Sequence, residues 1–291
     1  MLVLVVALSG CRSSSSSQAS PITTKGNGAS RPSSAATTPT SIDPYVPSIV
    51  TYATTPGILR GYLYYPAGHG PFPAVIFHHG SEEDPGAKND QAHFYVAHGF
   101  ALFLPHRRGQ GLSVGAGVNI VQAFRSSGRD PAVLVDHLER QADDAAASVR
   151  YVQGLPNIDA TRVAVAGCSL GGIEALLLAE RDLGIRAAID FAGAAMTWAS
   201  SPPLQRRMKE AARGARVPIF FLQAENDFDV APSRVLADEM NRAGKPMRVH
   251  VFPAQGIGPE DGHGFCLAGA GSPPWGDEVL AFLREAMPET H

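Results

Sequence analysis

The chain has few cysteines, little net charge and no long hydrophobic segment, and each shortage excludes a class of protein. Three cysteines in 291 residues cannot form the disulfide framework of a small secreted protein. A formal net charge of -3 gives no reason to expect a nucleic-acid partner. The apolar run over residues 1–8 is too short to span a bilayer, and no internal repeat is visible.

The sequence also lacks the motifs of common cofactor sites. No cluster of His, Cys and Asp residues shows the spacing of metal ligands. The glycine-rich segment 106–113 has neither the GxGxxG spacing nor the Gly-Lys-Ser/Thr ending of a phosphate-binding loop. We therefore expect no metal and no other cofactor. Segment 106–113 is interpreted as a loop at the rim of the functional site, where Arg107 and Arg108 either contact an acidic substrate or are solvated or salt-bridged.

The first 11 residues resemble the signal peptide of a bacterial lipoprotein. The apolar run leads into Leu-Ser-Gly-Cys, and in such a lipobox the cysteine, here Cys11, is lipidated and becomes the mature N-terminus. No Lys or Arg precedes the run. A secretory signal without lipidation, or a misassigned start on a cytoplasmic protein, is therefore the alternative.

Residues 12–44 are dominated by Ser, Thr, Pro, Ala and Gly. Such a segment cannot bury enough apolar surface to offset chain entropy, which predicts a flexible tether between a membrane and a folded domain over residues 45–291. We expect the protein to be exported and anchored to a bacterial membrane through a lipid on Cys11. A secreted or periplasmic protein is the alternative.

From residue 45 onwards, predicted strands alternate with predicted helices. Strands are expected over residues 49–54, 59–65, 73–79, 100–105, 187–191, 217–223 and 247–252, and helices over residues 90–98, 131–152 and 275–287. The Gly- and Ser-rich residues 114–130 are expected to be irregular. The alternation predicts an α/β domain with a mainly parallel central sheet and helices on both faces. Segment 192–215 is too short for a large cap domain.

The most informative segment is a Gly-x-Ser-x-Gly motif at residues 167–171, between an apolar run and a predicted helix over residues 173–182. Small residues two before and two after the serine allow a tight strand-to-helix turn that raises a nucleophile above the sheet. A turn centred on Cys168 would instead place Leu170 where only a small residue fits. We therefore predict Ser169 as the nucleophile. The N–H of Leu170 would point to where an oxyanion forms.

Two later turns supply a candidate acid and base. Asp227 follows an apolar strand, and His263 lies in a Gly-flanked loop after the last predicted strand. The histidine would accept the proton of the serine, and the aspartate would orient the imidazole. Asp229 is the alternative acid. His250, inside a strand, and His291, at the end of the chain, are weaker candidates for the base.

The remaining candidates concern the second oxyanion donor and the substrate pocket. The backbone N–H of Ser81 is predicted as the donor, with Glu82 as the alternative, and His78 and His79 are expected to orient this loop. If both are ordinary loop residues, neither donates. Trp198 either lines the pocket, together with Arg108, or simply packs. Glu174, in the helix after the motif, is expected to face solvent.

Two cysteines lie in the folded part of the chain. Cys168 adjoins the predicted nucleophile, and Cys266 follows the predicted base by three residues. The two thiols are therefore candidates for a disulfide, with two free thiols as the alternative.

With its serine, aspartate and histidine in that order, the chain resembles an α/β-hydrolase, most closely the dienelactone-hydrolase-like and acyl-esterase branches. The resemblance is carried by the motif at 167–172, His79-Gly80, Glu225-Asn226-Asp227 and Gly262 to Phe265, and covers residues 46–287. It implies the α/β-hydrolase fold without a large cap and a Ser-Asp-His triad. Dienelactone hydrolases carry a cysteine nucleophile, so the serine here argues against dienelactone itself as the substrate.

The resemblance implies a serine hydrolase that cleaves a small-molecule carboxylic ester through an acyl-enzyme. One alternative is a peptidase related to the catalytic domain of prolyl oligopeptidase, although no length remains for its selectivity domain. The other is a surface binding protein that kept the fold and lost turnover.

Overall fold

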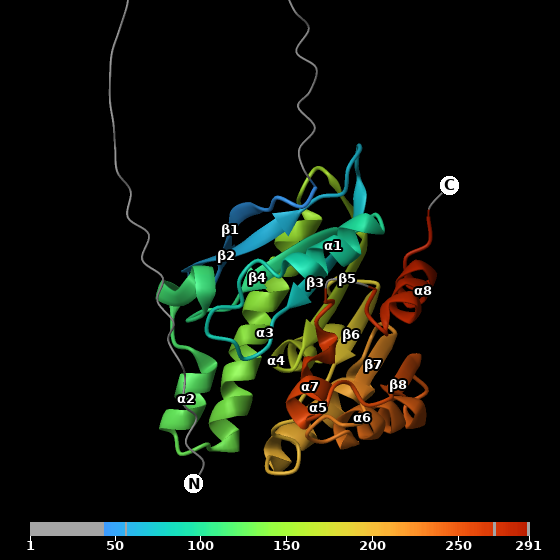
Figure 1. The fold of residues 1–291 in the computed structure, drawn as a ribbon. Coiled ribbons are helices and arrows are strands. Elements are labelled where there is room, and N and C mark those ends of the chain that lie inside the picture. Colours follow the sequence, from blue (N-terminus) through green and yellow to red (C-terminus); the bar gives the residue numbers. More distant parts are fainter. Residues whose placement is uncertain (1–43, 56, 270–271, 290–291) are drawn as a thin grey trace, which may run out of the picture. The chain divides into compact units, whose positions relative to one another are not determined.

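An eight-stranded sheet is the scaffold of the computed structural model, which describes residues 44–55, 57–269 and 272–289 (Figure 1). In order across the sheet the strands are β1 (Ser48–Thr54), β2 (Gly57–Tyr64), β4 (Ala101–His106), β3 (Phe72–His78), β5 (Ile158–Cys168), β6 (Ala187–Phe191), β7 (Ile219–Ala224) and β8 (Met247–Phe252). β2 pairs antiparallel with β1 and with β4, and the other neighbouring strands are parallel.

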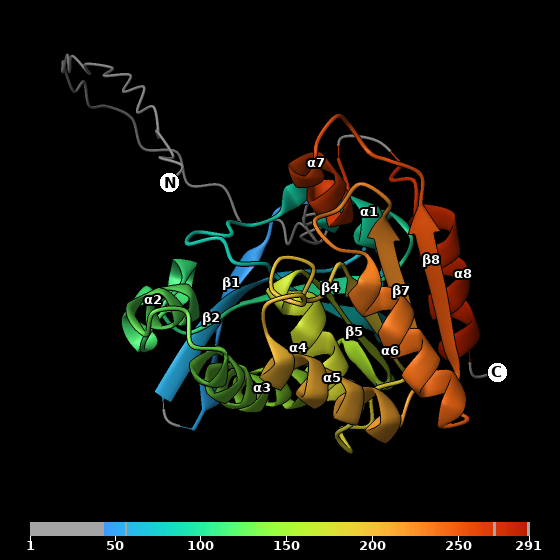
Figure 2. The ribbon, with the colours of Figure 1, turned by 90° about the horizontal axis from the view of Figure 1, so that it is seen from below.

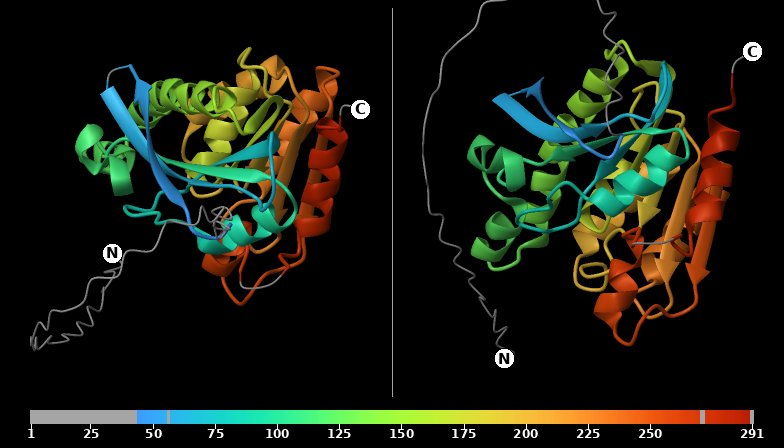
Figure 3. Two further views of the ribbon diagram at one scale, coloured as in Figure 1. Left: turned by 90° about the horizontal axis from the view of Figure 1, so that it is seen from above. Right: turned by 45° about the horizontal axis from the view of Figure 1, so that its top comes forward.

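Helices connect the parallel strands and cover both faces of the sheet (Figures 2 and 3). They are α1 (Asn89–Ala97), η1 (Gly111–Ala116), α2 (Ile120–Ser126), α3 (Pro131–Gln153), α4 (Leu170–Ala179), α5 (Pro202–Gly214), α6 (Ala231–Arg242), α7 (Pro259–His263), η2 (Gly264–Cys266) and α8 (Gly276–Ala286). The described residues of Ser41–His291 form one compact unit.

Two hydrophobic cores lie on opposite sides of the sheet. The larger core packs α3, α4, α5 and α6 against one face, with Leu138, Leu176 and Met208 among its buried side chains. The second packs α1 and α8 against the other face around Tyr95 and Trp275. Burial of large apolar side chains on both faces is what a parallel sheet requires, because each of its faces is covered by helices.

The parallel strands place their carboxyl ends along one edge of the sheet. β3, β5, β7 and β8 run in the same direction and end at His78, Cys168, Ala224 and Phe252. The turns that follow these strands are therefore neighbours in space although they are far apart in sequence. Ligand sites of open α/β sheets lie at this edge.

The predicted architecture is confirmed: the sheet is mainly parallel, with helices on both faces. Between β6 and β7 the chain forms α5 and no large cap. The turn that carries the Gly-x-Ser-x-Gly motif, residues 167–171, is called the elbow below. The helix that follows it, α4, begins at Leu170, earlier than the predicted start at residue 173.

The prediction that residues 114–130 are irregular is wrong. This segment contains the end of η1 and the whole of α2. The Asn119 side chain caps α2 by accepting hydrogen bonds from the N–H groups of Val121 (2.8 Å) and Gln122 (3.2 Å). Val121 and Phe124 then pack against the larger core. The helices α6 and α7 were not predicted from the sequence.

The predicted signal peptide, its lipidated Cys11 and the tether up to residue 43 lie outside the described residues.

Candidate active site

Ser169 occupies the apex of a strained turn between β5 and α4. Its φ of 57° and ψ of -115° lie in a region that residues with a side chain rarely adopt. The flanking glycines are required by contact: a Cβ on Gly167 would overlap the backbone of Gly171, and a Cβ on Gly171 would overlap the backbone of His78. This is the geometry that the Gly-x-Ser-x-Gly motif predicts for a serine at its centre.

A third glycine lets the elbow pack onto the neighbouring strand. A Cβ on Gly172 would overlap the carboxylate of Asp190, which is fully buried and accepts a hydrogen bond of 2.8 Å from the N–H of Gly193. Burial raises the pKa of Asp190 to about 7, although the Gly193 N–H opposes the shift. The elbow therefore rests directly on β6.

Asp227 and His263, the predicted acid and base, are hydrogen-bonded to each other. His263 Nδ1 lies 2.8 Å from Asp227 Oδ1, and the Asp227 side chain is fully buried whereas that of His263 is 15% exposed. Asp227 Oδ1 also accepts from the N–H of Phe228 at 2.7 Å, and Oδ2 accepts from Gln223 Nε2 at 2.9 Å. With three donors, the carboxylate is held in one orientation.

The two turns that carry Asp227 and His263 are fastened together by Asn226. Its side-chain Nδ2 donates to the carbonyl oxygens of Gln255 (2.8 Å) and Gly258 (2.9 Å), and its Oδ1 accepts from the N–H of Gln255 (2.8 Å). A Cβ on Gly262 would overlap Asn226, so the loop approaches as closely as glycine allows.

A disulfide between Cys168 and Cys266 joins the nucleophile turn to the histidine loop, with the two Cα atoms 5.9 Å apart. Of the two alternatives that the sequence left open, the structure shows the disulfide. The loop is anchored further by Gln91 Nε2, which donates to the Cys266 carbonyl (3.0 Å), and by Trp275 Nε1, which donates to the Phe265 carbonyl (2.8 Å).

Within the described residues, Ser169 Oγ makes no hydrogen bond, and none joins it to His263. The disulfide nevertheless holds the two loops together, because Cys168 directly precedes Ser169 and Cys266 follows His263 by three residues. In enzymes without a bound substrate, catalytic hydrogen bonds are often long and tighten when the substrate binds.

The alternative acid and base have other partners. Asp229 Oδ1 accepts from the N–H of Ala231 at 2.8 Å, at the start of α6. His250 Nδ1 lies 2.9 Å from Glu278 on the exposed face of β8. His291 lies outside the described residues.

The loop after β3 is held by hydrogen bonds to a buried arginine, Arg107. Arg107 Nη2 donates to the carbonyl oxygens of His79 (2.6 Å) and Gly80, and the Arg107 N–H donates to His79 Nε2 (3.2 Å). Burial, and then the adjacent Arg107 cation, lower the pKa of His79 well below its ordinary value. His79 is therefore a neutral acceptor for this loop.

These contacts orient the backbone of Ser81. The peptide bond between Gly80 and Ser81 is trans, so the N–H of Ser81 points away from the carbonyl that Arg107 binds. Ser81 lines a cavity together with Ser169 and Leu170. An oxyanion site needs a backbone donor directed at the reacting carbonyl, and Ser81 remains the predicted one. Glu82, the alternative, is not among the residues that line this cavity, and its side chain forms an ion pair of 2.6 Å with Lys88.

The expectation that Glu174 faces solvent is wrong. Its carboxylate is fully buried, with Oε2 2.9 Å from Arg107 Nη1 and 3.3 Å from His78 Nδ1. Burial alone would raise the pKa of Glu174, but the charge of Arg107 and the contact with His78 hold it below its ordinary value. Glu174 lies on α4, so the elbow helix and the loop after β3 are linked through a buried ion pair.

The cavity beside Ser169 has a volume of about 200 Å³. Neither Trp198 nor Arg108, the residues predicted for the substrate pocket, is among the residues that line it. Trp198 is buried in the larger core. Arg108 Nη2 pairs with Asp144 Oδ1 on α3 at 2.5 Å. Sequence reasoning missed the actual wall of the cavity because α2 was taken for irregular structure.

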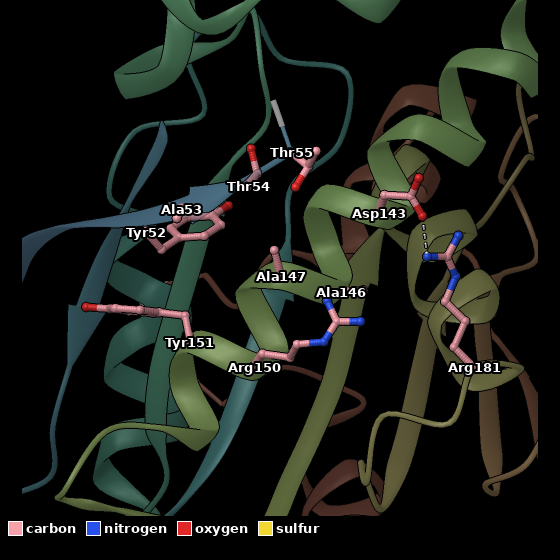
Figure 4. A pocket seen from close by; sticks show the side chains of 10 residues that line it. All are labelled: Tyr52, Ala53, Thr54, Thr55, Asp143, Ala146, Ala147, Arg150, Tyr151 and Arg181. Carbon is pink, nitrogen blue, oxygen red and sulfur yellow. Dashed lines mark hydrogen bonds and ion pairs between the residues drawn. The ribbon is translucent and has the colours of Figure 1, made fainter. Parts of the chain in front are cut away.

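A larger cavity of about 670 Å³ lies between β1 and α3 (Figure 4). Tyr52, Thr54 and Arg150 are among its lining residues, and it contains none of the predicted site residues. Among the described residues, no group of three or more His, Cys, Asp or Glu side chains is arranged to hold a metal ion.

Comparison with known proteins gives one family match and several structural neighbours. The model of the dienelactone hydrolase family matches residues 59–272. Acylaminoacyl peptidase from Pyrococcus horikoshii has a TM-score of 0.62 at 14% identity, over 84% of this chain and 42% of that chain. Dipeptidyl peptidase 4 from Porphyromonas gingivalis has a TM-score of 0.60 at 15% identity, over 82% of this chain and 35% of that chain.

A protein of Klebsiella pneumoniae assigned as a dienelactone hydrolase has a TM-score of 0.60 at 15% identity, over 83% of this chain and 97% of that chain. The matched part covers less than half of the acylaminoacyl peptidase and of dipeptidyl peptidase 4. At these identities the likeness shows the α/β-hydrolase fold alone. No curated protein matches the sequence.

The elbow contacts predict the effect of adding one methyl group. Gly171→Ala would force the backbone of the elbow away from His78, and overpacking of this kind costs about 1–3 kcal/mol or more. Gly115→Ala is the matched control, because a Cβ there has no heavy atom within 4 Å. Urea denaturation should show a lower unfolding midpoint for Gly171→Ala than for Gly115→Ala. Equal midpoints would contradict the close contact.

The buried ion pair predicts strong coupling between its partners. Arg107→Met leaves Glu174 buried without its cation and should reduce the free energy of unfolding by about 3–5 kcal/mol. Adding Glu174→Gln should restore part of this loss. Arg140→Met, which removes an ion pair with Asp136 on the exposed face of α3, should cost at most about 1 kcal/mol. Additive losses for Arg107→Met and Glu174→Gln, measured by urea denaturation, would rule out the coupling.

Proposed function

Because the chain belongs to the dienelactone hydrolase family, we propose that this hydrolase cleaves a carboxylic ester through an acyl-enzyme formed on Ser169. The observation that carries the proposal is the hydrogen-bonded pair of Asp227 and His263. The disulfide ties this pair to the strained turn that presents the serine. A merely structural turn would need neither a partly exposed serine in a strained conformation at its apex nor a buried carboxylate bonded to a histidine.

The proposed reaction gives each of these groups one task. Ser169 Oγ attacks the ester carbonyl while His263 Nε2 accepts its proton, and Asp227 holds Nδ1–H and stabilises the imidazolium. The N–H groups of Leu170 and Ser81 stabilise the negative oxygen of the tetrahedral intermediate. The imidazolium returns the proton to the leaving alcohol as the C–O bond breaks. Water, activated by the same histidine, then hydrolyses the acyl-enzyme.

A peptidase is the second candidate, because the structural neighbours include the two peptidases named above. This chain spans only 42% and 35% of their lengths, so what they do as whole proteins does not transfer to it directly. An amide has a poorer leaving group than an ester. We therefore favour the ester, with a peptide panel as the comparison.

We also propose that the protein is exported and lipid-anchored at Cys11. The disulfide between Cys168 and Cys266 supports export, since structural disulfides persist in oxidising compartments. In the described part of the chain, no helix has the length and apolar character needed to cross a bilayer.

The esterase mechanism predicts that activity is lost when Ser169 is replaced and kept when another serine is replaced. Ser169→Ala should lower kcat for p-nitrophenyl acetate by at least about 10³-fold, because the attacking oxygen is removed. It should also abolish covalent labelling by a fluorophosphonate probe. Ser48→Ala, at the exposed start of β1, is the control and should retain both properties. Full activity in Ser169→Ala would refute the mechanism, and unlabelled wild-type protein would favour a non-catalytic binding protein.

If the protein is lipidated, its recovery in the membrane fraction should depend on the thiol of Cys11. Cells producing the wild-type chain with radioactive palmitate should yield labelled protein in the membrane fraction, because the acyl chains are attached at Cys11. Cys11→Ser should be unlabelled and recovered in another fraction. Palmitate labelling that persists in Cys11→Ser, or an unlabelled wild-type chain, would count against the anchor.

A further inference from the structure

The cavity beside Ser169 combines an apolar wall with positive charge. Its wall is formed mainly by apolar side chains of α2, α3 and α4 and of the segment after β6, including Phe124, Leu134, Ile173 and Met196. Two further lining residues, Arg125 and Arg129, are exposed and come from the end of α2 and the turn after it. Among the described residues that line the cavity, none has an acidic side chain.

The two arginines are not engaged with another part of the described chain. Within the described residues, neither guanidinium has a hydrogen-bond or ion-pair partner. Arg107 and Arg108, in contrast, are bound to the buried carboxylates of Glu174 and Asp144. The positive charge at the cavity is therefore available to a ligand.

The lining residues also show which part of an ester the cavity would hold. The leaving alcohol must lie next to His263, because this residue returns the proton to it. His263 does not line the cavity, whereas Ser169, Leu170 and Ser81 do. The cavity thus extends from the carbonyl carbon on the side away from the leaving group. Its occupant is the acyl group.

We propose that the preferred substrate carries a short apolar acyl chain with a negatively charged group, such as a carboxylate, at its far end. The chain would lie against the apolar wall, and the charged end would meet Arg125 and Arg129. Guanidinium groups bind carboxylates in paired hydrogen bonds, and two of them on one cavity favour an anion over its neutral analogue. This inference rests on the proposed esterase function.

The volume limits the length of the acyl group. At about 200 Å³ the cavity lies below the usual size range of ligand sites, which favours a short acyl group over a long one. Four methylenes and a carboxylate beyond the ester carbonyl make a short chain with a charged end. A half-ester of adipic acid is therefore the test compound.

The experiment compares two esters with the same leaving group and the same chain length. One is the p-nitrophenyl half-ester of adipic acid, and the other is its terminal amide, which has the same shape without the charge. The ratio of their kcat/KM values, corrected for spontaneous hydrolysis, is independent of the active fraction of each preparation. Exposed charge pairs contribute roughly two- to fivefold each, so the wild-type ratio should be roughly 4 to 25 in favour of the anion.

Substitution of the arginines should remove the preference. The ratio should fall to near one in the double variant Arg125→Gln/Arg129→Gln and should decrease in wild type as salt rises, because ions screen exposed charges. Arg284→Gln on α8 changes the net charge by the same amount as either single substitution and should leave the ratio unchanged. A wild-type ratio of one or less, or an unchanged ratio in the double variant, would overturn the inference.

The outcomes separate this inference from the proposed function. If the amide is hydrolysed and labelling of Ser169 persists, but the anion is not preferred, only the acyl specificity is wrong. If neither ester is hydrolysed and Ser169 is not labelled, the esterase function fails and the specificity fails with it.

Discussion

The backbone of the nucleophile turn lies so close to its neighbours that no side chain fits between them. Gly167 faces Gly171, Gly171 faces the end of β3, and Gly172 faces a carboxylate on β6. These contacts hold Ser169 in a backbone conformation that costs energy, since a strained residue persists only where its surroundings leave it no alternative. The other groups of the candidate site are arranged around this fixed point.

Two loops of the candidate site are attached to the nucleophile turn by different kinds of interaction. The histidine loop is attached covalently, through Cys168 and Cys266. The loop after β3 is attached electrostatically, since Arg107 binds its carbonyl groups and is itself held by Glu174 on the elbow helix. A buried ion pair gives little net stability compared with apolar packing, but a carboxylate and a guanidinium have directions that apolar groups lack. Here the ion pair serves to orient the loop after β3 relative to α4.

The sequence predicted the sheet, its covered faces and the position of the elbow because these depend on local patterns. A run of apolar residues marks a buried strand, and glycines at fixed offsets mark a turn that has no room for side chains. The pairing of Asp227 with His263 followed from chain order within a resembling fold. The structure adds the distance between them.

The errors concern residues whose surroundings come from distant parts of the chain. Glu174 was expected in solvent because charged helix residues usually are, yet α4 is apolar on every side, and that was a signal that it is buried all round. Its partner is 67 positions away, which no local pattern reveals. The helix α2 was missed because glycines and serines surround it, and its cap at Asn119 was not recognised.

The disulfide closes a covalent ring over a sequence separation of 98, and Ser169, Asp227 and His263 all belong to that ring. A protease that cuts once in any loop of this ring opens it without releasing a fragment. The nicked molecule remains one covalent body that carries all three residues. Degradation of this protein outside a reducing environment therefore has to begin with two cuts within the ring or with attack on the chain on either side of it.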